Sequence, residues 1–298
     1  MPIEWFHERH GWAERNHAYL EGARKMFRDS VAGALESASW AGQDVDCVVT
    51  VTSSGIAKPT LEAQLFSEMG FRRDVMRVPI FGLGCAGGVS GLSVAQSLAD
   101  AAAGRKVLLV VVEACSVSFR ADRMQKADII AAALFGDGSA AACLGTDAPL
   151  CDGRIELGSG HQSLWPDTLD IMGWDVDETG LGVIFDRSIA EFVTSEFAQA
   201  TAGALKAANL DPGQIDRFVC HPGGAKVVEA VERSLHLAQG SLDAERETLR
   251  NYGNMSAPSV LFVMQAVLDG GARGQMMACA LGPGFTASYL PFHVGLAA

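Results

Sequence analysis

The chain has 298 residues, of which 49% are hydrophobic and 19% charged, which is enough apolar material for a large α/β core of one domain or two fused halves. The formal net charge is −12 and the Lys and Arg residues are scattered, which argues against nucleic acid or an anionic membrane surface as the main partner. The longest uninterrupted aliphatic run, 107–112, ends at Glu113 and is too short to span a membrane.

The spacing of apolar residues predicts a first half built from alternating helices and strands. In chain order we expect a helix over 12–38, a strand over 47–51, a helix over 61–69, a strand over 78–81, a helix over 86–103, and strands over 107–112 and 138–144. The Gly-, Asp- and Pro-containing stretch 145–153 is the best boundary. We therefore divide the chain into halves 1–148 and 149–298.

The second half repeats a similar succession of elements. We expect helices over 189–208, 225–237 and 258–268, and strands over 217–220, 276–280 and 286–292. This recurrence predicts an α/β protein made of duplicated halves, each with a mostly parallel sheet.

Seven cysteines without a Cys-x-x-Cys pair, and a mixed polar start unlike a signal peptide, predict a reduced cytoplasmic protein. They are Cys47, Cys85, Cys115, Cys143, Cys151, Cys220 and Cys279. Their spacing shows no metal-ligand motif, so we expect no metal site.

The segment 82–91, GLGCAGGVSG, places Cys85 among five glycines between an apolar strand and a helical pattern. Glycines permit a sharp turn and the close approach of a substrate. A cysteine at a helix N-terminus has a lowered thiol pKa, because the unpaired N–H groups and the helix dipole favour the thiolate. The segment therefore favours Cys85 as a nucleophile over a buried small hydrophobic residue on a tight turn.

Two further residues occupy comparable junctions in the second half. His221 ends a predicted strand and precedes Pro-Gly-Gly and a helix, where open α/β sheets bind their ligands. Asn254 lies in a loop before a helix for which Ser256 is the expected N-cap. Taken alone, His221 is better explained as a buried or capping side chain, and Asn254 is equally well explained as a capping or turn residue or as a donor to an oxyanion. Because such junctions line one edge of a doubly wound sheet, we expect both near Cys85.

The order Cys, His, Asn and its spacing also occur in papain-like proteases. Three features argue against such a protease: the nucleophile segment is Gly-Cys-Ala-Gly, the cysteine usage indicates a reducing compartment, and a complete α/β segment precedes Cys85.

Five segments in order across nearly the whole chain resemble type III polyketide synthases, the chalcone/stilbene synthase family of the thiolase fold. They are FGLGCAGG (81–88), LFGDG (134–138), HPGG (221–224), YGNMS (252–256) and GPGF (282–285). The stretch 164–174 resembles bacterial members more than plant ones. The resemblance implies thiolase-like halves in a layered αβαβα arrangement, with the nucleophile in 1–148 and the His and Asn in 149–298.

The resemblance also implies the reaction. Cys85 would accept the starter from an acyl-CoA and carry the growing chain, and His221 would pair with its thiolate. With Asn254, His221 would bind the thioester oxygen of malonyl-CoA, where N–H donors stabilise the enolate formed on decarboxylation. CoA thioesters are the expected substrates, and no cofactor is expected.

Further positions follow from the same resemblance. Phe135 and Phe185 would gate the passage between the CoA tunnel and the reaction cavity. Lys58 would cross a homodimer interface into the partner's cavity. The remaining positions would line the substrate cavity: Ser53, Cys115, Ser118, Gly223 and Gly224.

We expect a fatty acyl starter and an alkylpyrone or alkylresorcinol product. A malonyl-primed synthase making a polyhydroxynaphthalene is the alternative within enzymes. Family members also carry a further N-terminal segment with a central strand of the first sheet and basic residues that grip the CoA phosphates. We expect its absence here to leave two buried strand edges unpaired, so an inactive paralogue that serves as a dimer partner is a third hypothesis.

Overall fold

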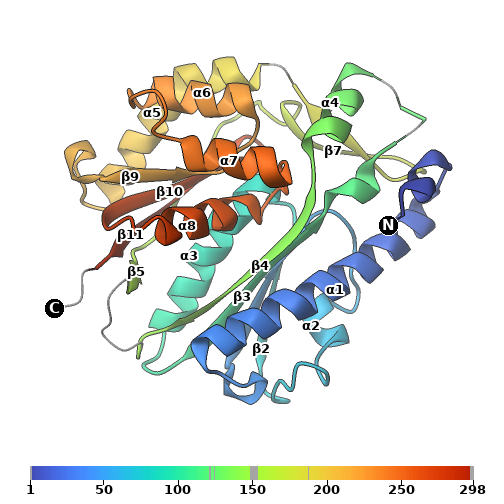
Figure 1. Cartoon of the computed structure of the whole chain (residues 1–298), viewed down its shortest axis with the longest axis horizontal. Helices are drawn as coiled ribbons and strands as arrows, with labels where there is room; N and C mark the ends of the chain where they lie inside the picture. The colour runs from blue at the N-terminus through green and yellow to red at the C-terminus, as the bar shows by residue number, and fades with distance from the viewer. Residues whose placement is uncertain (1, 121, 124, 148–153, 187, 296–298) are drawn as a thin grey trace.

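Five alternating layers of helix and sheet make up the molecule in the computed structural model, which describes residues 2–120, 122–123, 125–147, 154–186 and 188–295 (Figure 1). One sheet comes from the first half of the chain and a second from the second half, with helices between them and on both outer faces. The predicted α/β class and the αβαβα layering are confirmed. The predicted boundary at 148/149 lies outside the described residues, as does Cys151.

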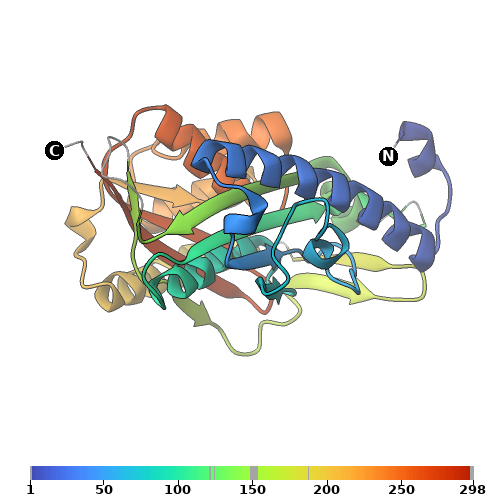
Figure 2. The same ribbon diagram turned by 90° about the horizontal axis from the view of Figure 1, so that it is seen from below.

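The first half forms a four-stranded sheet in the order β2-β1-β3-β4. Strands β2 and β3 both pair with β1 in parallel, and β4 pairs with β3 antiparallel. The elements are α1 (Trp12–Ala38), β1 (Cys47–Val51), α2 (Leu61–Gln64), β2 (Met76–Ile80), α3 (Gly87–Asp100), β3 (Lys106–Ala114), α4 (Lys126–Leu134) and β4 (Asp137–Gly145). Figure 2 shows α1 lying along this sheet on the face away from α3.

The second half forms a sheet in the order β5-β11-β10-β9, with β6 also pairing with β11. Its elements are β5 (Ile155–Leu157), β6 (His161–Leu164), α5 (Ile189–Ala207), β9 (Arg217–Cys220), α6 (Ala225–Ser234), α7 (Asp243–Tyr252), α8 (Ser259–Asp269), β10 (Gly274–Gly282) and β11 (Thr286–Val294). Here the expectation of mostly parallel pairing needs correction, because among the described strands of this sheet only β9 and β10 pair in parallel. The short turn 283–285 between β10 and β11 is the reason, since so short a connection can join only antiparallel strands.

A separate antiparallel hairpin joins β7 (Met172–Val176) to β8 (Leu181–Phe185), and its two strands pair only with each other among the described residues. This hairpin, α4 and α7 were not predicted from the sequence. Helix α7 is highly polar, DAERETLRNY, and buries only Glu245 and Thr248, so its sequence lacks the apolar stripe by which a helix is recognised. The predicted helix 61–69 ends at Gln64.

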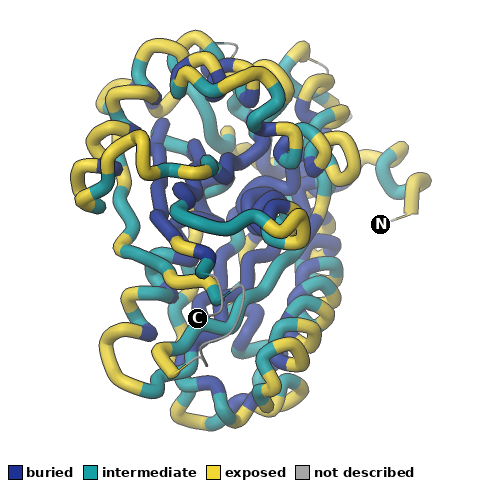
Figure 3. The backbone as a smooth tube through the Cα atoms, turned by 60° about the vertical axis from the view of Figure 1, so that its left-hand side comes forward, coloured by how far each residue is buried: buried dark blue, intermediate teal, exposed yellow. Residues whose placement is uncertain are grey.

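The core lies between the layers, and the alternation of side chains along the strands assigns each residue to one face. On β1, Val49 and Val51 face α3 and α8, whereas Val48 faces α1. Both faces of the sheet are therefore covered, as the continuous apolar runs of its strands indicate. Figure 3 shows the buried backbone concentrated in the middle of the molecule, with exposed residues around it.

Strands β1 and β3 pair directly with each other, in the register Cys47 with Val107 through Val51 with Val111. The expectation that a missing central strand would leave two buried edges unpaired is therefore wrong. The backbone groups of the two strands satisfy each other, so no desolvation cost arises at this point of the sheet.

Helix α3, which follows Cys85, approaches the start of α8 at Gly88, so we expect Gly88→Ala to destabilise the fold. A Cβ at Gly88 would lie 2.3 Å from the carbonyl oxygen of Ala257 and 2.7 Å from Cγ1 of Val260. Backbone must shift to admit it, and overpacking of this kind costs about 1–3 kcal/mol. The matched control is Gly33→Ala on the exposed side of α1, where no atom lies within 4 Å of the added Cβ.

Because Gly33 lies inside a helix, its substitution by Ala is expected to stabilise by up to about 1 kcal/mol. Denaturant unfolding of both variants measures the two effects. Equal changes in unfolding free energy for the two variants would show that the contact at Gly88 carries no strain.

Candidate active site

The turn between β2 and α3 presents Cys85 to the interior. Gly82 and Gly84 have φ values of +90° and +45°, a backbone region that favours glycine, and a 3₁₀ turn over Gly84–Ala86 leads into α3. A Cβ at Gly84 would lie 2.8 Å from Cδ of Pro283, so this glycine also permits the turn to pack against 283–285. Cys85 is 8% exposed, at the wall of a small cavity.

Asn254 lies next to the Cys85 thiol with its amide fixed in orientation. The Sγ of Cys85 is 3.9 Å from Oδ1 and 4.0 Å from Nδ2 of Asn254. Oδ1 accepts the backbone N–H of Ser256 at 2.8 Å, and Nδ2 donates to the carbonyl of Gly223 at 3.2 Å. These two bonds distinguish the oxygen from the nitrogen and leave the second N–H of the amide as a donor on the side of Cys85.

His221 follows β9 and faces the same cavity as Cys85 and Asn254. Its backbone N–H donates to the carbonyl of Cys279 at 2.8 Å, which extends the pairing of β9 with β10 by one residue. Both ring nitrogens are buried and neither has a hydrogen-bond partner among the described residues. A buried imidazole with one free donor and one free acceptor is suited to a polar ligand in the cavity. The structure thus brings together the three residues that the sequence placed at separate junctions.

The charge state of this group differs from the sequence expectation. Burial raises the pKa of the Cys85 thiol to about 11, outweighing the hydrogen bonds from Ser256 and Asn254 that lower it. Burial also lowers the pKa of His221 to about 3. The expected lowering of the thiol pKa by the helix N-terminus is therefore wrong, because desolvation opposes the thiolate more strongly here. Burial therefore favours the neutral forms of both the thiol and the imidazole.

Three cavities adjoin one another near Cys85, and Cys85 itself lines two of them. Cys85, His221, Asn254 and Phe185 are among the residues that line a cavity of about 20 Å³. A second, of about 50 Å³, shares Cys85 and Phe185 with the first, and it also contacts Phe135. The rings of Phe135 and Phe185 meet edge to face, with centroids 6.3 Å apart.

The third cavity is larger, about 270 Å³, and its surface is mostly apolar, from residues that include Phe6, Phe119 and Ala132, although Arg120 and Asp128 also line it. It shares Cys115, Phe135 and Val183 with the second cavity. The walls that separate the three spaces therefore come from the β7–β8 hairpin, from Cys85, from Phe135 directly after α4, and from Cys115 directly after β3.

The other residues predicted to bind substrate line different cavities. Ser53 lines the second cavity, and its Oγ accepts the N–H groups of Gly82 at 3.1 Å and Gly84 at 3.4 Å, which supports the turn before Cys85. Cys115 lines the second and third cavities, whereas Ser118 lines the third and donates to the carbonyl of Cys115 at 2.6 Å.

In the second half, Gly223 lines the first cavity. Gly224 has a φ of +159° and precedes the first residue of α6, outside the lining of these cavities. Lys58 is exposed on the loop after β1 and does not reach the cavities of its own chain.

Comparison with known proteins places this geometry in a family. Residues 9–148 match the N-terminal domain of chalcone and stilbene synthases, and residues 156–296 match the C-terminal domain. The chain belongs to the chalcone and stilbene synthase family. The synthase is 35% identical over 303 residues to the 1,3,6,8-tetrahydroxynaphthalene synthase of Streptomyces peucetius subsp. caesius, covering 97% of this chain and 78% of the relative.

One further relative and one solved structure indicate the same family. The synthase is 31% identical over 278 residues to type III polyketide synthase A of Arabidopsis thaliana, covering 89% of this chain and 70% of the relative. The crystal structure of 1,3,6,8-tetrahydroxynaphthalene synthase from Streptomyces coelicolor A3(2) matches with a TM-score of 0.93 at 27% identity, over 100% of this chain and 85% of that one. The expected family and the thiolase-like fold are confirmed.

The protein is therefore an acyltransferase of the type III polyketide synthase class, and CoA thioesters are the substrates of this class. No group of three or more His, Cys, Asp or Glu side chains in the described part of the synthase is placed to hold a metal ion. None of its described helices is both long and apolar enough to cross a membrane.

Two parts of the cavity wall were missed by the sequence analysis. The β7–β8 hairpin contributes Met172, Trp174 and Val183, and nothing in its sequence indicates that it folds over Cys85. Glu113 also lines the second cavity, 1% exposed, and accepts N–H groups from Ser53 and Ser54 at 2.9 Å. A carboxylate that directly follows a buried apolar strand is a signal that was available for Glu113.

We expect Glu113→Gln to change how the stability of the synthase depends on pH. Burial raises the pKa of Glu113 from 4.5 to about 7, so the folded state holds this proton more tightly than the unfolded chain. The stabilising contribution is complete below about pH 4.5 and is lost as the pH rises through about 7. At about 1.4 kcal/mol per pKa unit, the wild type loses at most about 3 kcal/mol of unfolding free energy relative to the variant over this range.

Urea unfolding at about pH 5 and about pH 8 measures this change. Glu247→Gln on α7 is the control, because the Glu247 side chain is 63% exposed. A difference between wild type and Glu113→Gln that is the same at both pH values would contradict a raised pKa at Glu113.

Proposed function

We propose that the synthase loads an acyl group from an acyl-CoA onto Cys85 and extends it with malonyl-CoA units by decarboxylative Claisen condensation. A fatty acyl starter and cyclisation to an alkylpyrone or alkylresorcinol complete the proposal. The observation that carries it is the apolar cavity of about 270 Å³, which adjoins the cavity of Cys85 through Cys115, Phe135 and Val183.

Cys85 and His221 line one cavity, as a nucleophile and its general base require. As the Cys85 sulfur attacks the thioester carbon, its proton passes to the free nitrogen acceptor of His221. The tetrahedral intermediate then collapses, the bond to the CoA sulfur breaks, and the departing thiolate takes the proton from the imidazolium. His221 thus acts as the general base of the loading step.

Condensation uses the donors of the same site. The neutral imidazole of His221 retains one N–H, and Asn254 has its second amide N–H on the side of Cys85. Both donate to the thioester oxygen of malonyl-CoA, where negative charge develops as CO2 leaves. The enolate carbon then attacks the acyl thioester, a C–C bond forms, and the Cys85 thiolate is released for the next transfer.

The size and chemistry of the third cavity support the fatty starter. At roughly 30 Å³ for a group the size of water, 270 Å³ accommodates about nine such groups, each close in size to a methylene. The lining of this cavity is largely apolar, which favours a hydrocarbon chain over a polar one. Phe135 and Phe185 lie between this space and the cavity of His221, where they would gate passage, and Ser53, Cys115, Ser118 and Gly223 would shape the walls.

Malonyl priming is the second candidate, because two relatives are named as 1,3,6,8-tetrahydroxynaphthalene synthases. In that case the third cavity would hold a growing polyketide chain and not a starter.

We also propose a homodimer through the edge of β2. Three apolar side chains near this edge are strongly exposed, Phe81 at 61%, Ile56 at 50% and Met76 at 47%, and Lys58 lies on the adjoining loop.

Radiolabelled malonyl-CoA offered with a panel of acyl-CoAs tests the function. Release of CO2 and a labelled product that carries the starter chain would support the fatty starter. The same product from malonyl-CoA alone as with every acyl-CoA would favour malonyl priming. Absence of both CO2 and product would contradict the proposed reaction.

A further inference from the structure

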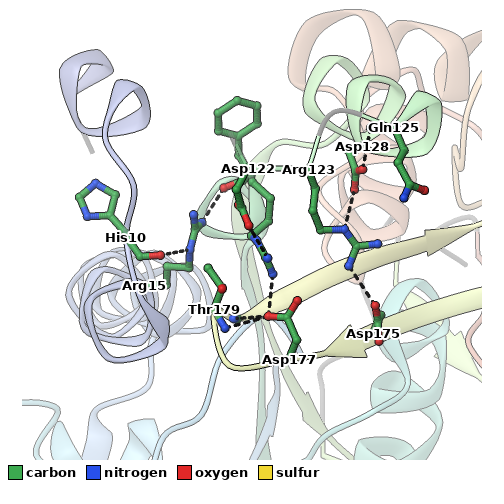
Figure 4. A network of polar contacts seen from close by, with 12 residues as sticks. His10, Arg15, Asp122, Arg123, Gln125, Asp128, Asp175, Asp177 and Thr179 are labelled. Carbon is green, nitrogen blue, oxygen red and sulfur yellow. Dashed lines mark hydrogen bonds and ion pairs between the residues drawn. The ribbon is translucent and has the colours of Figure 1, made fainter.

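Ion pairs join the β7–β8 hairpin to the segment that carries Arg120 and Arg123 and, through Arg123, to α4 (Figure 4). Arg120 contacts Asp177 of the hairpin at 2.9 Å and Asp122 at 2.7 Å. Arg123 contacts Asp175 at 2.9 Å from the same segment. The two strands pair with no other strand among the described residues, so side-chain contacts hold the hairpin in place. They are these ion pairs, the hydrogen bond from Nε1 of Trp174 to the carbonyl of Ser53 at 2.9 Å, and the packing of buried Leu181 and Val183.

The two arginines of the network differ in burial: Arg120 is buried, whereas Arg123 is 22% exposed and its partner Asp175 is 57% exposed. Arg120 is 4% exposed, and Arg15 of α1 is 5% exposed. Arg15 donates to the carbonyls of Val117 at 2.8 Å and His10 at 3.0 Å, so it joins α1 to the segment that carries Arg120. A partly buried charge that loses its partner is costly, which makes the geometry of such a network well defined.

Two glycines of the hairpin leave room for the side chains of Arg123 and Arg15. A Cβ at Gly182 would lie 2.0 Å from Nη1 of Arg123, and one at Gly180 would lie 3.0 Å from Cδ of Arg15. The guanidinium of Arg123 therefore lies directly against the backbone of β8. Arg123 also contacts Asp128 in the first turn of α4 at 3.6 Å.

The same two elements carry the walls between the cavities. The hairpin contributes Val183 and Phe185, and Phe135 directly follows α4. Arg123 thus holds, through Asp175 and Asp128, both elements whose phenylalanines meet edge to face beside Cys85. A shift of the hairpin would change the passage from Cys85 to the 270 Å³ cavity.

We propose that Arg120 and Arg123, with Asp177 and Asp175 as their hairpin partners, are positioning residues that set the passage between Cys85 and the third cavity. They thereby determine which acyl chains the synthase accepts. The part that concerns chain selection rests on the proposed function, whereas the effect on the passage does not.

Asp177→Asn is the sharpest variant, because it removes the charge but keeps the turn. Oδ1 of Asp177 accepts the N–H groups of Thr179 at 2.8 Å and Gly180 at 3.1 Å, and an asparagine oxygen can accept both. Asp175→Asn tests the second pair. Glu247→Gln is the control, because it neutralises a carboxylate of the Arg250 pair on exposed α7.

Two measurements test the proposal. Without substrate, the rate of Cys85 alkylation by iodoacetamide is followed by mass spectrometry of its peptide, and we expect about a fivefold change in Asp177→Asn and a similar one in Asp175→Asn. With hexanoyl-, dodecanoyl- and hexadecanoyl-CoA, we expect the relative kcat/KM values to change through KM, while decarboxylation of malonyl-CoA alone stays as in wild type.

Alkylation rates and starter preferences equal to wild type in both hairpin variants would overturn the proposal, as would equal changes in Glu247→Gln. If wild type uses no fatty acyl-CoA, the proposed starter fails, but the alkylation rates still test the passage.

Discussion

Replacing Cys85 with alanine is expected to abolish polyketide formation, with at least a thousandfold loss, while decarboxylation of malonyl-CoA remains measurable. The variant removes the only atom that can carry the acyl chain in the proposed reaction. His221 and Asn254 stay in place, because Asn254 is held by Ser256 and Gly223 and not by the thiol. Both donors can still stabilise the enolate of malonyl-CoA.

The two steps are separated by measuring labelled CO2 and labelled product in one reaction, and by mass spectrometry of the acylated enzyme. Cys143→Ala is the matched control, since Cys143 lies on β4 with its thiol toward the carbonyl of Ala34 on α1, outside the three cavities. We expect it to form acyl-enzyme and product as wild type does. Acylation of the Cys85→Ala variant would show that another group is the nucleophile.

The position of the three candidate residues could be predicted because each has a local signature. Cys85 lies between a strand and a helix in a run of glycines, and His221 and Asn254 lie at comparable junctions. In a layered α/β fold such junctions meet at one edge, so their juxtaposition follows from topology. Their ionisation could not be predicted in this way, because the pKa of Cys85 depends on burial by residues from the other half of the chain.

The cavity walls were beyond prediction for a related reason. The β7–β8 hairpin is positioned by arginines about fifty residues earlier in the chain, and its own sequence, rich in Gly and Asp, has a weak strand pattern. The antiparallel pairing of β11 was missed although the Gly-Pro-Gly turn before it signals a hairpin. Local patterns thus locate elements well, whereas contacts made across the chain decide the shape of the substrate space.

Asn254→Asp is expected to reduce decarboxylation of malonyl-CoA by about a hundredfold or more, the loss typical for one oxyanion donor. The aspartate has nearly the same shape, and its Oδ1 can still accept the N–H of Ser256. Its second oxygen, however, replaces the donor to Gly223 and to the cavity by an acceptor. A carboxylate beside the thioester oxygen repels the developing enolate, so the substitution acts on the transition state more than on binding of the substrate.

The expected signature is a loss in kcat with a smaller change in KM, measured as release of labelled CO2. Asn209→Asp is the control for the chemical change itself, because Asn209 is exposed just after α5 and lines none of the three cavities. Thermal unfolding separates a loss of catalysis from a loss of folded protein. Decarboxylation within a fewfold of wild type in folded Asn254→Asp would mean that the amide beside Cys85 positions the loop and does not bind the oxyanion.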